Sequence, residues 1–546
     1  MRPRDASKPL AAPASRRGLT RALVPFAATL AAAILSWQSG SSAAEPYEVT
    51  MRDMQRQMAE GRETSRSLTE RYLARIEAID RKGPELRSVL EINPDAQSIA
   101  AELDEERRRG HVRGPLHGIP ILLKDNIATG DRMLTTAGSL ALADRPAPRD
   151  AFIVRRLREA GAVILGKTNL SEWANFRSTR SSSGWSARGG QTRNPYVLDH
   201  SPSGSSSGSA VAVSAGLAAA AVGTETDGSI VSPSSANGVV GLKPTVGLVS
   251  RTGIVPISHS QDTAGPIARS VADAAMLLAA LAGPDPADPT TTVHPRTPSD
   301  YANALNPAAL KGARLGVVRE RFFGHSQVVD ALADRAIDVM RRQGATIVDP
   351  VVIDTLGSFD PAEFQVLLYE FPRDLERFFT WWGPGAPLRT VADIVAFNSA
   401  HADSELPYFG QEILERAGRG GPLSDLAYRE TLARIRRLAG EDGIDAAMRR
   451  HRLDALVAPT SGPAWPIDYT RGDSGSAVRP SPATIAAVAG YPHITVPMGH
   501  DRSLPIGLSF FGRAWSEPRL IGLAFAYEQA SRERRPPAFL PTLAQP

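Results

Sequence analysis

Apolar runs that alternate with amphipathic stretches dominate the chain after residue 46. Residues 119–123 are apolar and predict a buried strand that ends at Lys124. Residues 150–160 predict a helix and residues 162–165 the next strand, and further apolar runs at 455–457 and 494–496 predict two more strands. Because the alternation of helices and strands continues after Val211, the pattern predicts the α/β class.

Two long segments have a more helical character. Residues 47–80 are helical in pattern, and residues 67–70 (Ser-Leu-Thr-Glu) match a capping box, which places the start of a helix at Ser67. Residues 355–450 contain several amphipathic stretches and crowded aromatic residues at 371–382. We expect this second segment to form a helical, lobe-like region beside the functional site, with its aromatic residues as candidates for the wall of the acyl pocket.

The Ser- and Gly-rich segment at residues 178–209 allows two interpretations. By composition alone it is compatible with a flexible linker. It lies between regular elements, however, and contains Trp185 and Tyr196, so we favour an ordered loop wrapped on the sheet. Residues 283–300, rich in Pro, Asp and Thr, predict a surface crossover.

The first 44 residues predict an export signal. Basic residues precede an apolar run at 22–37, and small residues follow at 42–44. The run is short for a membrane span, and an uncleaved N-terminal anchor is the alternative. Arg16 and Arg17 also resemble a twin-arginine signal. We expect a periplasmic or secreted monomer without stable membrane association after cleavage, with residues 45–546 as a single domain.

Composition excludes several kinds of chemistry. The formal net charge is +4, but the excess of basic residues lies in the first 44 residues, so no nucleic-acid partner is expected. Cysteine is absent, which excludes thiolate nucleophiles and Cys-ligated zinc. None of the 10 His accompanies a Gly-x-Ser-x-Gly turn or forms a metalloprotease pair, and no phosphate-binding Lys follows the Gly-rich segment. A catalytic Ser in this chain therefore needs a base other than His.

Three segments suggest such a base when they are taken together. They are residues 114–125, which end in Lys124-Asp125, residues 203–210 and residues 223–230. Together they resemble the amidase signature family. Supporting matches lie at residues 166–172, 241–245, 262–266, 489–492 and 504–507. The resemblance covers about residues 46–536 and implies the amidase signature fold, a large, mostly parallel mixed sheet covered by helices on both faces, without metal or cofactor.

The resemblance also implies a catalytic triad. The family's nucleophile falls on Ser229, its bridging serine on Ser205 and its buried lysine on Lys124, and a cis peptide is implied at Gly204–Ser205. A buried lysine can act as a base because desolvation lowers its pKa. It would accept a proton from Ser205, while Ser205 accepts one from Ser229, which attacks the carboxamide carbon.

The resemblance assigns the oxyanion hole to the backbone N–H groups of Thr226, Asp227, Gly228 and Ser229. Gly228 has no Cβ, so the backbone can approach the substrate closely there. Other polar residues of the matching segments are expected to serve the scaffold: Asp125 and Asp262 as hydrogen-bond acceptors, and Lys167 and Asn169 as supports.

Departures within the family narrow the substrate. Many members have Ile-Arg-x-Pro after the nucleophile, whereas this chain has Val231 in place of the Arg. Residues 169–176, 183–191 and 514–518 resemble peptide amidases of the family, which remove the C-terminal amide of peptides. Asn175 and Gln191 are candidates for contact with the substrate amide. Among small-molecule and peptide amides, we therefore expect the C-terminal amide of peptides as the substrate, with release of ammonia.

Three other functions stay open at this point. The first is a general aliphatic or aryl-acylamide amidase with esterase activity, since an acyl-enzyme serves both reactions. The second is the glutaminase subunit of a tRNA-dependent amidotransferase, which the leader argues against because that enzyme is cytoplasmic. The third is an exported amide-binding protein without catalysis, although all three triad positions are filled.

Overall fold

The computed structural model describes residues 47–293, 299–475 and 480–544. The predicted export signal, residues 1–44, lies outside the described residues. The chain from Tyr47 onward forms one compact unit. Among the described residues, the helices are all too short or too polar to cross a membrane.

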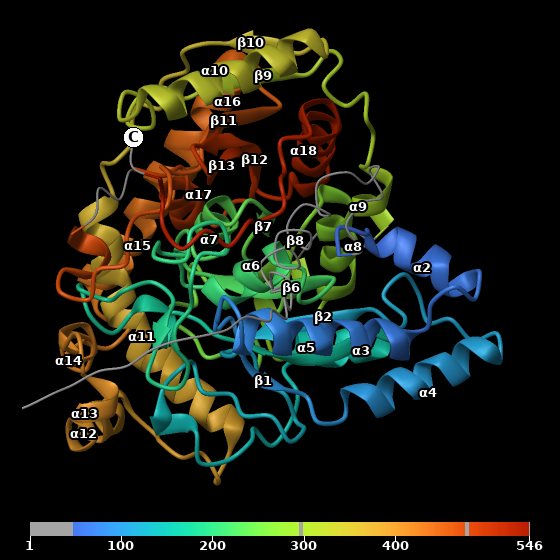
Figure 1. The fold of residues 1–546 in the computed structure, drawn as a ribbon. Helices are drawn as coiled ribbons and strands as arrows, with labels where there is room; N and C mark the ends of the chain where they lie inside the picture. Colours follow the sequence, from blue (N-terminus) through green and yellow to red (C-terminus); the bar gives the residue numbers. More distant parts are fainter. Residues whose placement is uncertain (1–46, 294–298, 476–479, 545–546) are drawn as a thin grey trace, which may run out of the picture. The chain divides into compact units, whose positions relative to one another are not determined.

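An 11-stranded sheet forms the centre of this unit, in the order β1-β3-β2-β6-β8-β7-β12-β13-β11-β9-β10 (Figure 1). Its strands are β1 Val89–Ile92, β2 Pro120–Lys124, β3 Val163–Thr168, β6 Ala220–Glu225, β7 Val240–Lys243, β8 Thr263–Ala268, β9 Arg314–Val317, β10 Thr346–Val348, β11 Ala455–Pro459, β12 His493–Asp501 and β13 Leu504–Phe511. All strands predicted from apolar runs are present. They belong to β2, β3, β11 and β12, in which the predicted apolar positions are buried.

The sheet is mixed, but parallel pairs are fewer than the sequence predicts. Parallel pairing joins β3, β2 and β6 near one edge and β11, β9 and β10 at the other. The pairs between β6 and β11 and the edge pair β1–β3 are antiparallel. The reason is the connections: β12 and β13 are joined by a two-residue turn, and such a hairpin can only pair antiparallel strands.

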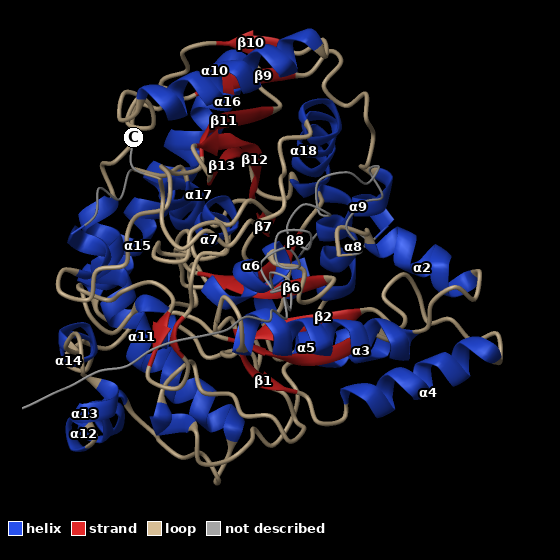
Figure 2. Ribbon diagram, viewed as in Figure 1, coloured by secondary structure: helices blue, strands red, loops and turns tan. Residues whose placement is uncertain are grey.

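Helices cover both faces of the sheet (Figure 2). They are α2 Met51–Ala59, α3 Ser65–Arg75, α4 Ala96–Arg108, α5 Phe152–Glu159, α6 Ser207–Ser214, α7 Val231–Ala236, α8 Val271–Leu281, α9 Ser299–Asn303, α10 Gln327–Arg342, α17 Ala483–Ala489 and α18 Glu517–Ser531. α6 and α7 contact each other, whereas α8, α10 and α18 form a second connected group on the same central strands. The two groups therefore lie on opposite faces.

The region at 355–450 is helical, as the pattern predicts. It contains α11 Asp360–Trp382, α12 Val391–Ala400, α13 Ala402–Glu405, α14 Glu412–Ala417, α15 Leu426–Ala439 and α16 Ala446–His451. Residues 178–209 form an ordered loop with a two-stranded hairpin, β4 Trp185–Ser186 and β5 Gly190–Gln191, and most of their side chains are buried. The linker interpretation is therefore wrong.

The predicted start of the first long helix is also wrong. α3 begins at Ser65, with Thr64 as the N-cap, and Thr64 and Ser67 cap each other's backbone N–H groups. Ser67 is therefore the third helical residue and not the cap. The predicted partner at the fourth position, Glu70, instead lies 2.9 Å from Arg66 in an exposed ion pair. Two overlapping patterns fit the sequence, and the contacts of Ser65 with Asp104 and Gly118 support the earlier start.

Candidate active site

The ends of β2 and β6 bring the predicted triad segments together. Lys124 is the last residue of β2, and its Nζ lies 2.8 Å from Ser205 Oγ and 2.8 Å from Thr224 Oγ1. The backbone N–H of Ser206 donates to the Ser229 carbonyl at 3.1 Å. This bond joins the segment before α6 to the loop between β6 and α7. Lys124, Ser205 and the loop of Ser229 thus meet at the carboxyl ends of β2 and β6.

Half of the predicted proton relay is formed. Lys124 and Ser205 are fully buried, while Ser229 is 8% exposed. Among the described residues, Ser229 Oγ has no hydrogen-bond partner, so the Lys124–Ser205 contact is present without a Ser205–Ser229 bond. Catalytic hydrogen bonds are often long in ligand-free structures and tighten with substrate. The Gly204–Ser205 peptide is cis, as the resemblance implies.

Burial makes Lys124 a potential base near neutral pH. Desolvation lowers the pKa of Lys124 to about 7, against the opposing effect of the negative charges of Asp262 and Glu225. An amine with such a pKa is largely neutral at mildly alkaline pH. In that form it has a lone pair for a hydroxyl proton.

Glu225, the last residue of β6, fixes the loop that follows it. Its Oε2 accepts hydrogen bonds from the backbone N–H of Ile230 at 2.7 Å and of Val231 at 3.0 Å, where α7 begins. The N–H of Gly228 also faces this carboxylate. Gly228 has a φ of +74°, and a Cβ there would lie 3.0 Å from Ser232 Oγ. Position 228 therefore favours glycine for two reasons: its positive φ, and the close contact that a Cβ would make with Ser232.

Three of the four predicted oxyanion donors are unpaired. The backbone N–H groups of Thr226, Asp227 and Ser229 have no hydrogen-bond partner among the described residues, whereas that of Gly228 is directed at Glu225. The structure therefore favours the backbone N–H groups of Thr226, Asp227 and Ser229 as donors. Unpaired N–H groups in one short loop are suited to a developing negative charge.

Two further residues hold this loop from the side. Thr226 Oγ1 donates to Asp262 at 2.6 Å, and Gln261 Nε2 donates to the Thr226 carbonyl at 3.2 Å. Gln261 Nε2 also lies 2.7 Å from Glu363 on α11, which joins the loop to the helical region. Asp262 is a half-buried hydrogen-bond acceptor, and desolvation of its carboxyl group raises its pKa to about 6.

Two cavities lie beside the loop. The first, which we call the lysine-side cavity, has a volume of about 400 Å³ and includes Asn126, Thr224 and Thr226 in its wall. The name reflects the direct contact of Thr224 with Lys124. The second, which we call the loop-side cavity, has about 390 Å³ and is lined by Asp227, Gly228, residues 480 and 481 and residues 483–485, among others.

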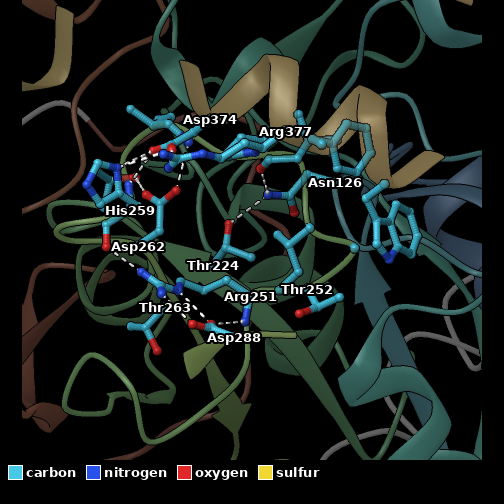
Figure 3. A pocket seen from close by; sticks show the side chains of 18 of the residues that line it. Asn126, Thr224, Arg251, Thr252, His259, Asp262, Thr263, Asp288, Asp374 and Arg377 are labelled. Atoms are coloured by element: carbon cyan, nitrogen blue, oxygen red, sulfur yellow. Dashed lines mark hydrogen bonds and ion pairs between the residues drawn. The ribbon is translucent and has the colours of Figure 1, made fainter. Parts of the chain in front are cut away.

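The lysine-side cavity has an apolar and a polar part (Figure 3). Phe378 and Trp381 of α11 form an aromatic wall of this cavity, while a role of residues 371–382 in an acyl pocket stays a prediction. Arg251 and Asp288 lie on the polar side, paired at 2.6 Å. These two charges therefore offset each other in the cavity wall.

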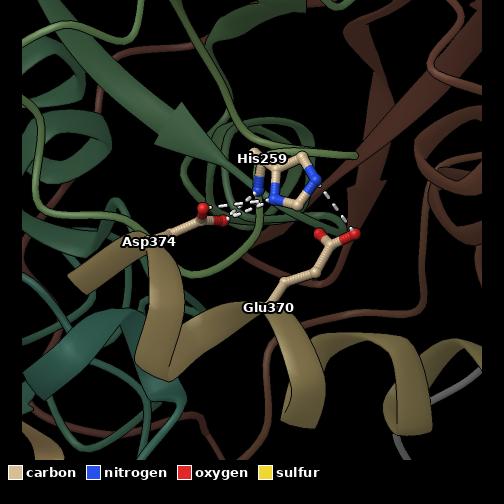
Figure 4. A group of neighbouring side chains, drawn as sticks. All are labelled: His259, Glu370 and Asp374. Carbon is tan, nitrogen blue, oxygen red and sulfur yellow. Dashed lines mark hydrogen bonds and ion pairs between the residues drawn. The ribbon is translucent and has the colours of Figure 1, made fainter. Parts of the chain in front are cut away.

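A cluster of His259, Glu370 and Asp374 borders the same cavity (Figure 4). His259 Nδ1 lies 2.9 Å from Asp374, and its Nε2 lies 3.5 Å from Glu370. Burial alone would lower the pKa of His259, but the hydrogen bond and charge of Asp374 raise it above the usual value. Glu370 also accepts from Tyr428 at 2.6 Å. Because protein donors already occupy these atoms, the cluster serves as a link between α11 and residues 258–260.

The candidate substrate contacts lie in the 178–209 loop and its surroundings. The Gln191 amide donates to the backbone carbonyls of Ser183 at 2.8 Å and Thr192 at 2.9 Å, which is a scaffold role. Asn175 donates to Ser183 Oγ at 3.2 Å. Neither residue lines the two cavities described above. The structure therefore places Asn175 and Gln191 outside the walls of both cavities.

The other polar residues that the sequence assigned to the scaffold make structural contacts. Asp125 accepts from Thr136 and lies 3.2 Å from Arg188. Lys167 donates to the Ile127 carbonyl at 2.7 Å, and Asn169 donates to backbone and side-chain acceptors of the 178–209 loop. These contacts agree with the roles expected from the sequence.

Comparison with known proteins decides the family. The family model described as Amidase matches residues 67–521. The chain belongs to the amidase family. This amidase is 43% identical over 510 residues to a probable amidase of Arabidopsis thaliana, with 92% of this chain and 93% of the relative covered. It is 42% identical over 486 residues to a putative amidase of Arthroderma benhamiae, with 85% and 78% covered.

A solved structure is closer in sequence. The native peptide amidase from Stenotrophomonas maltophilia has 57% identity to this amidase and a TM-score of 0.87, with 90% of this chain and 99% of that chain covered. The amidase signature fold predicted from the motifs is confirmed.

Sequence reasoning missed three residues of this amidase's site. Glu225 stands within a quoted motif, but its hydrogen bonds to the start of α7 are visible only in three dimensions. Thr224 contacts the lysine, and Asn126 donates to Thr224 Oγ1 at 3.0 Å. Their proximity to Lys124 and Ser229 in the chain is the one feature that could have drawn attention to them.

Proposed function

We propose that this amidase is a serine hydrolase that converts carboxamides to a carboxylate and ammonia through an acyl-enzyme. Ser229 is the nucleophile, Ser205 the proton relay and Lys124 the base. The observation that carries the proposal is the 2.8 Å contact between the buried amine of Lys124 and Ser205 Oγ, together with the lowered pKa of the amine.

The contacts of Lys124 fit a neutral amine. Nζ lies 2.8 Å from Thr224 Oγ1 and 3.2 Å from the Thr224 carbonyl, so two N–H bonds can donate to Thr224. The lone pair is then left for the hydroxyl proton of Ser205. As Ser205 gives up this proton it takes one from Ser229, whose Oγ attacks the carbonyl carbon. Reversal of the relay protonates the departing nitrogen, and water then cleaves the ester.

The negative charge that develops on the carbonyl oxygen would be met by the unpaired N–H groups of the loop at 226–229. A donor of this kind is worth ~3–4 kcal/mol of transition-state stabilisation. The loop is held on three sides, by Glu225, Gln261 and Asp262, so little reorganisation is required when the charge forms.

For the substrate, we propose the C-terminal amide of peptides. The support is the 57% identity to the peptide amidase of Stenotrophomonas maltophilia over nearly its whole length. The expected export of the chain through residues 1–44 suits an enzyme that meets peptides outside the cytoplasm, and it stays a proposal as well.

The test is ammonia release from an N-acetylated dipeptide amide. The unmodified protein should release one ammonia per peptide, and Ser229→Ala and Lys124→Met should lower kcat by roughly 10³-fold or more. Lys167→Met is the matched control, because Lys167 is also buried but contacts no Ser. Its kcat per folded molecule should stay near that of the parent.

The same experiment separates the alternatives. Activity on simple aliphatic or aryl amides and esters, without activity on peptide amides, would keep the triad and assign the general amidase function. Equal activity of the parent and Ser229→Ala would exclude Ser229 as the nucleophile. Absence of activity on every amide would favour a binding protein.

A further inference from the structure

One buried lysine has no part in the proton relay proposed above. Lys243 is the last residue of β7, it is fully buried, and its Nζ donates to the Pro244 carbonyl at 3.1 Å. Desolvation lowers its pKa to about 8, against the opposing effect of the negative charges of Glu225, Glu517 and Asp227. The amine is therefore mainly an ammonium ion at neutral pH. A buried charge of this kind is costly unless an opposite charge offsets it.

The sheet brings Lys243 to the same end and the same face as Glu225. β8 lies between β6 and β7 and pairs antiparallel with both, so the carboxyl ends of β6 and β7 lie at one end of the sheet. A glycine stands two residues before each charged residue. A Cβ at Gly223 would lie 2.8 Å from the side-chain hydroxyl at the N-cap of α6, and a Cβ at Gly241 2.2 Å from a hydroxyl of α7. Because side chains alternate along a strand, Glu225 and Lys243 point to the face that α6 and α7 cover.

The carboxyl group of Glu225 is only half satisfied by hydrogen bonds. Its Oε2 accepts from the N–H groups of Ile230 and Val231, whereas its Oε1 is buried and has no hydrogen-bond partner among the described residues. Burial raises the pKa of Glu225, and the charge of Lys243 is the largest of the effects that lower it. Protonation of this carboxyl group would weaken the hydrogen bonds that fix the start of α7, because a neutral acid is a poorer acceptor than a carboxylate.

We propose that Lys243 is a positioning residue for the oxyanion loop: its ammonium group keeps Glu225 ionised, and the carboxylate holds the N–H groups of residues 226–229 where the negative charge of the transition state develops. Among the described residues, Lys243 makes no hydrogen bond to the triad, so it acts through Glu225. The inference rests on the proposed function, because it assigns a role within the same reaction.

The first test compares the substrate with a transition-state analogue. The N-acetylated dipeptide amide gives kcat and KM, and the matching dipeptide aldehyde forms an adduct with Ser229 whose oxygen occupies the oxyanion hole. Lys243→Met should lower kcat per folded molecule by roughly tenfold or more and raise the inhibition constant of the aldehyde by a similar factor, with KM within roughly twofold of the parent. Lys167→Met, which removes another buried lysine, is the matched control and should change none of the three constants.

A double-mutant cycle tests the route through Glu225. Glu225→Gln keeps an acceptor oxygen for the N–H groups at the start of α7 but needs no opposite charge. Lys243→Met should therefore lower kcat by roughly tenfold or more in the parent and by less than roughly twofold in the Glu225→Gln variant. The double variant lacks one charge of each sign, so we expect it to be at least as stable as Lys243→Met alone. If Lys243→Met does not fold, the comparison of the double variant with Glu225→Gln still decides the matter.

Several outcomes would overturn the inference and leave the proposed function intact, provided that the parent releases ammonia. They are an unchanged kcat in Lys243→Met, a parallel rise of KM and of the aldehyde's inhibition constant, and equal losses of kcat with and without Glu225→Gln. Equal losses would assign the effect of Lys243 to Glu517 or to packing. Silence of the unmodified protein on every amide would refute the proposed function and this inference with it.

Discussion

At the scale of single residues, the chemistry depends on how the protein treats one buried amine. Among the described residues, no carboxylate is in contact with Lys124, although Asp262 and Glu225 act on it through their charge. Its hydrogen-bond partners are the neutral atoms of Ser205 and Thr224. A directly bound carboxylate would stabilise the ammonium form and remove the base. The choice of neutral partners keeps the amine titratable near neutral pH.

A pH dependence follows from this environment. Because burial lowers the pKa of Lys124 to about 7 and the neutral amine is the base, kcat/KM should rise with pH through about 7 and level off above it. Burial also raises the pKa of Asp227 to about 7, so its ionisation beside the oxyanion loop falls in the same range. The measurement is a profile of kcat/KM from about pH 5 to about pH 10 for the parent and for Asp227→Asn.

The variant separates the two groups. If Lys124 controls the rise, it persists in Asp227→Asn, whereas a rise that disappears in this variant assigns the titration to Asp227. A profile that falls through pH 7 would contradict a neutral lysine as the base.

At the scale of elements, the loop between β6 and α7 owes its shape to neighbours that are remote in the chain. Glu225 holds the start of α7, while the pair Gln261 and Asp262, just before β8, holds Thr226. The motif containing the loop could be recognised in the sequence, but its supports could not. A hydrogen bond between residues 36 positions apart leaves no periodic pattern in the chain.

Removal of one support should impair catalysis more than binding. Thr226→Val retains the shape of the side chain but deletes the 2.6 Å bond to Asp262, which leaves a half-buried acceptor with fewer donors. We expect kcat to fall roughly tenfold with little change in KM, and the free energy of unfolding to fall by about 1–3 kcal/mol. Steady-state kinetics and denaturant unfolding measure both.

A matched control distinguishes this effect from a general response to the loss of a hydroxyl. Thr69 on α3 is fully buried, and its Oγ1 has no hydrogen-bond partner among the described residues. Thr69→Val should therefore leave kcat unchanged and stability equal or higher. A similar loss of kcat in both variants would refute a specific role for the Thr226–Asp262 bond.

At the scale of the whole molecule, buried charges join the helical region to the segments that follow β2 and β3. Arg177 is fully buried and bonded to Glu172, and its Nη1 also donates to the Glu405 carbonyl at 2.6 Å. The guanidinium lies 4.1 Å from the Phe409 ring centre. Glu405 in turn accepts from the backbone of Leu140 at 2.8 Å. These contacts tie α13 to the segments around the 178–209 loop.

Loss of Arg177 should destabilise the protein strongly. Arg177→Met retains much of the volume but leaves two buried carboxyl groups without their cation, at a cost of about 3–5 kcal/mol in the free energy of unfolding. Denaturant unfolding is the measurement. Arg145→Met, which removes an exposed pair with Asp144, should cost about 1 kcal/mol or less. Equal effects of the two substitutions would show that the buried network contributes little.

Sequence alone predicted the fold family, four strands of the sheet and the segments that carry Lys124, Ser205 and Ser229, because each stands in a motif or an apolar run. It did not predict that antiparallel pairs outnumber parallel ones in the sheet, which depends on the connections. It placed Gln191 near the substrate, whereas the structure uses both N–H bonds of its amide within the loop. Such assignments depend on where a side chain points, and no local pattern records this.

The position of the oxyanion loop between two cavities has a kinetic consequence. Thr226 lines one cavity, and Asp227 and Gly228 line the other. If the acyl group and the amine occupy opposite sides, the first product can depart while the acyl group stays bound. An added nucleophile such as hydroxylamine can then enter by the vacated side and compete with water. The enzyme would act as an acyltransferase, and hydroxamate would form in proportion to the hydroxylamine supplied.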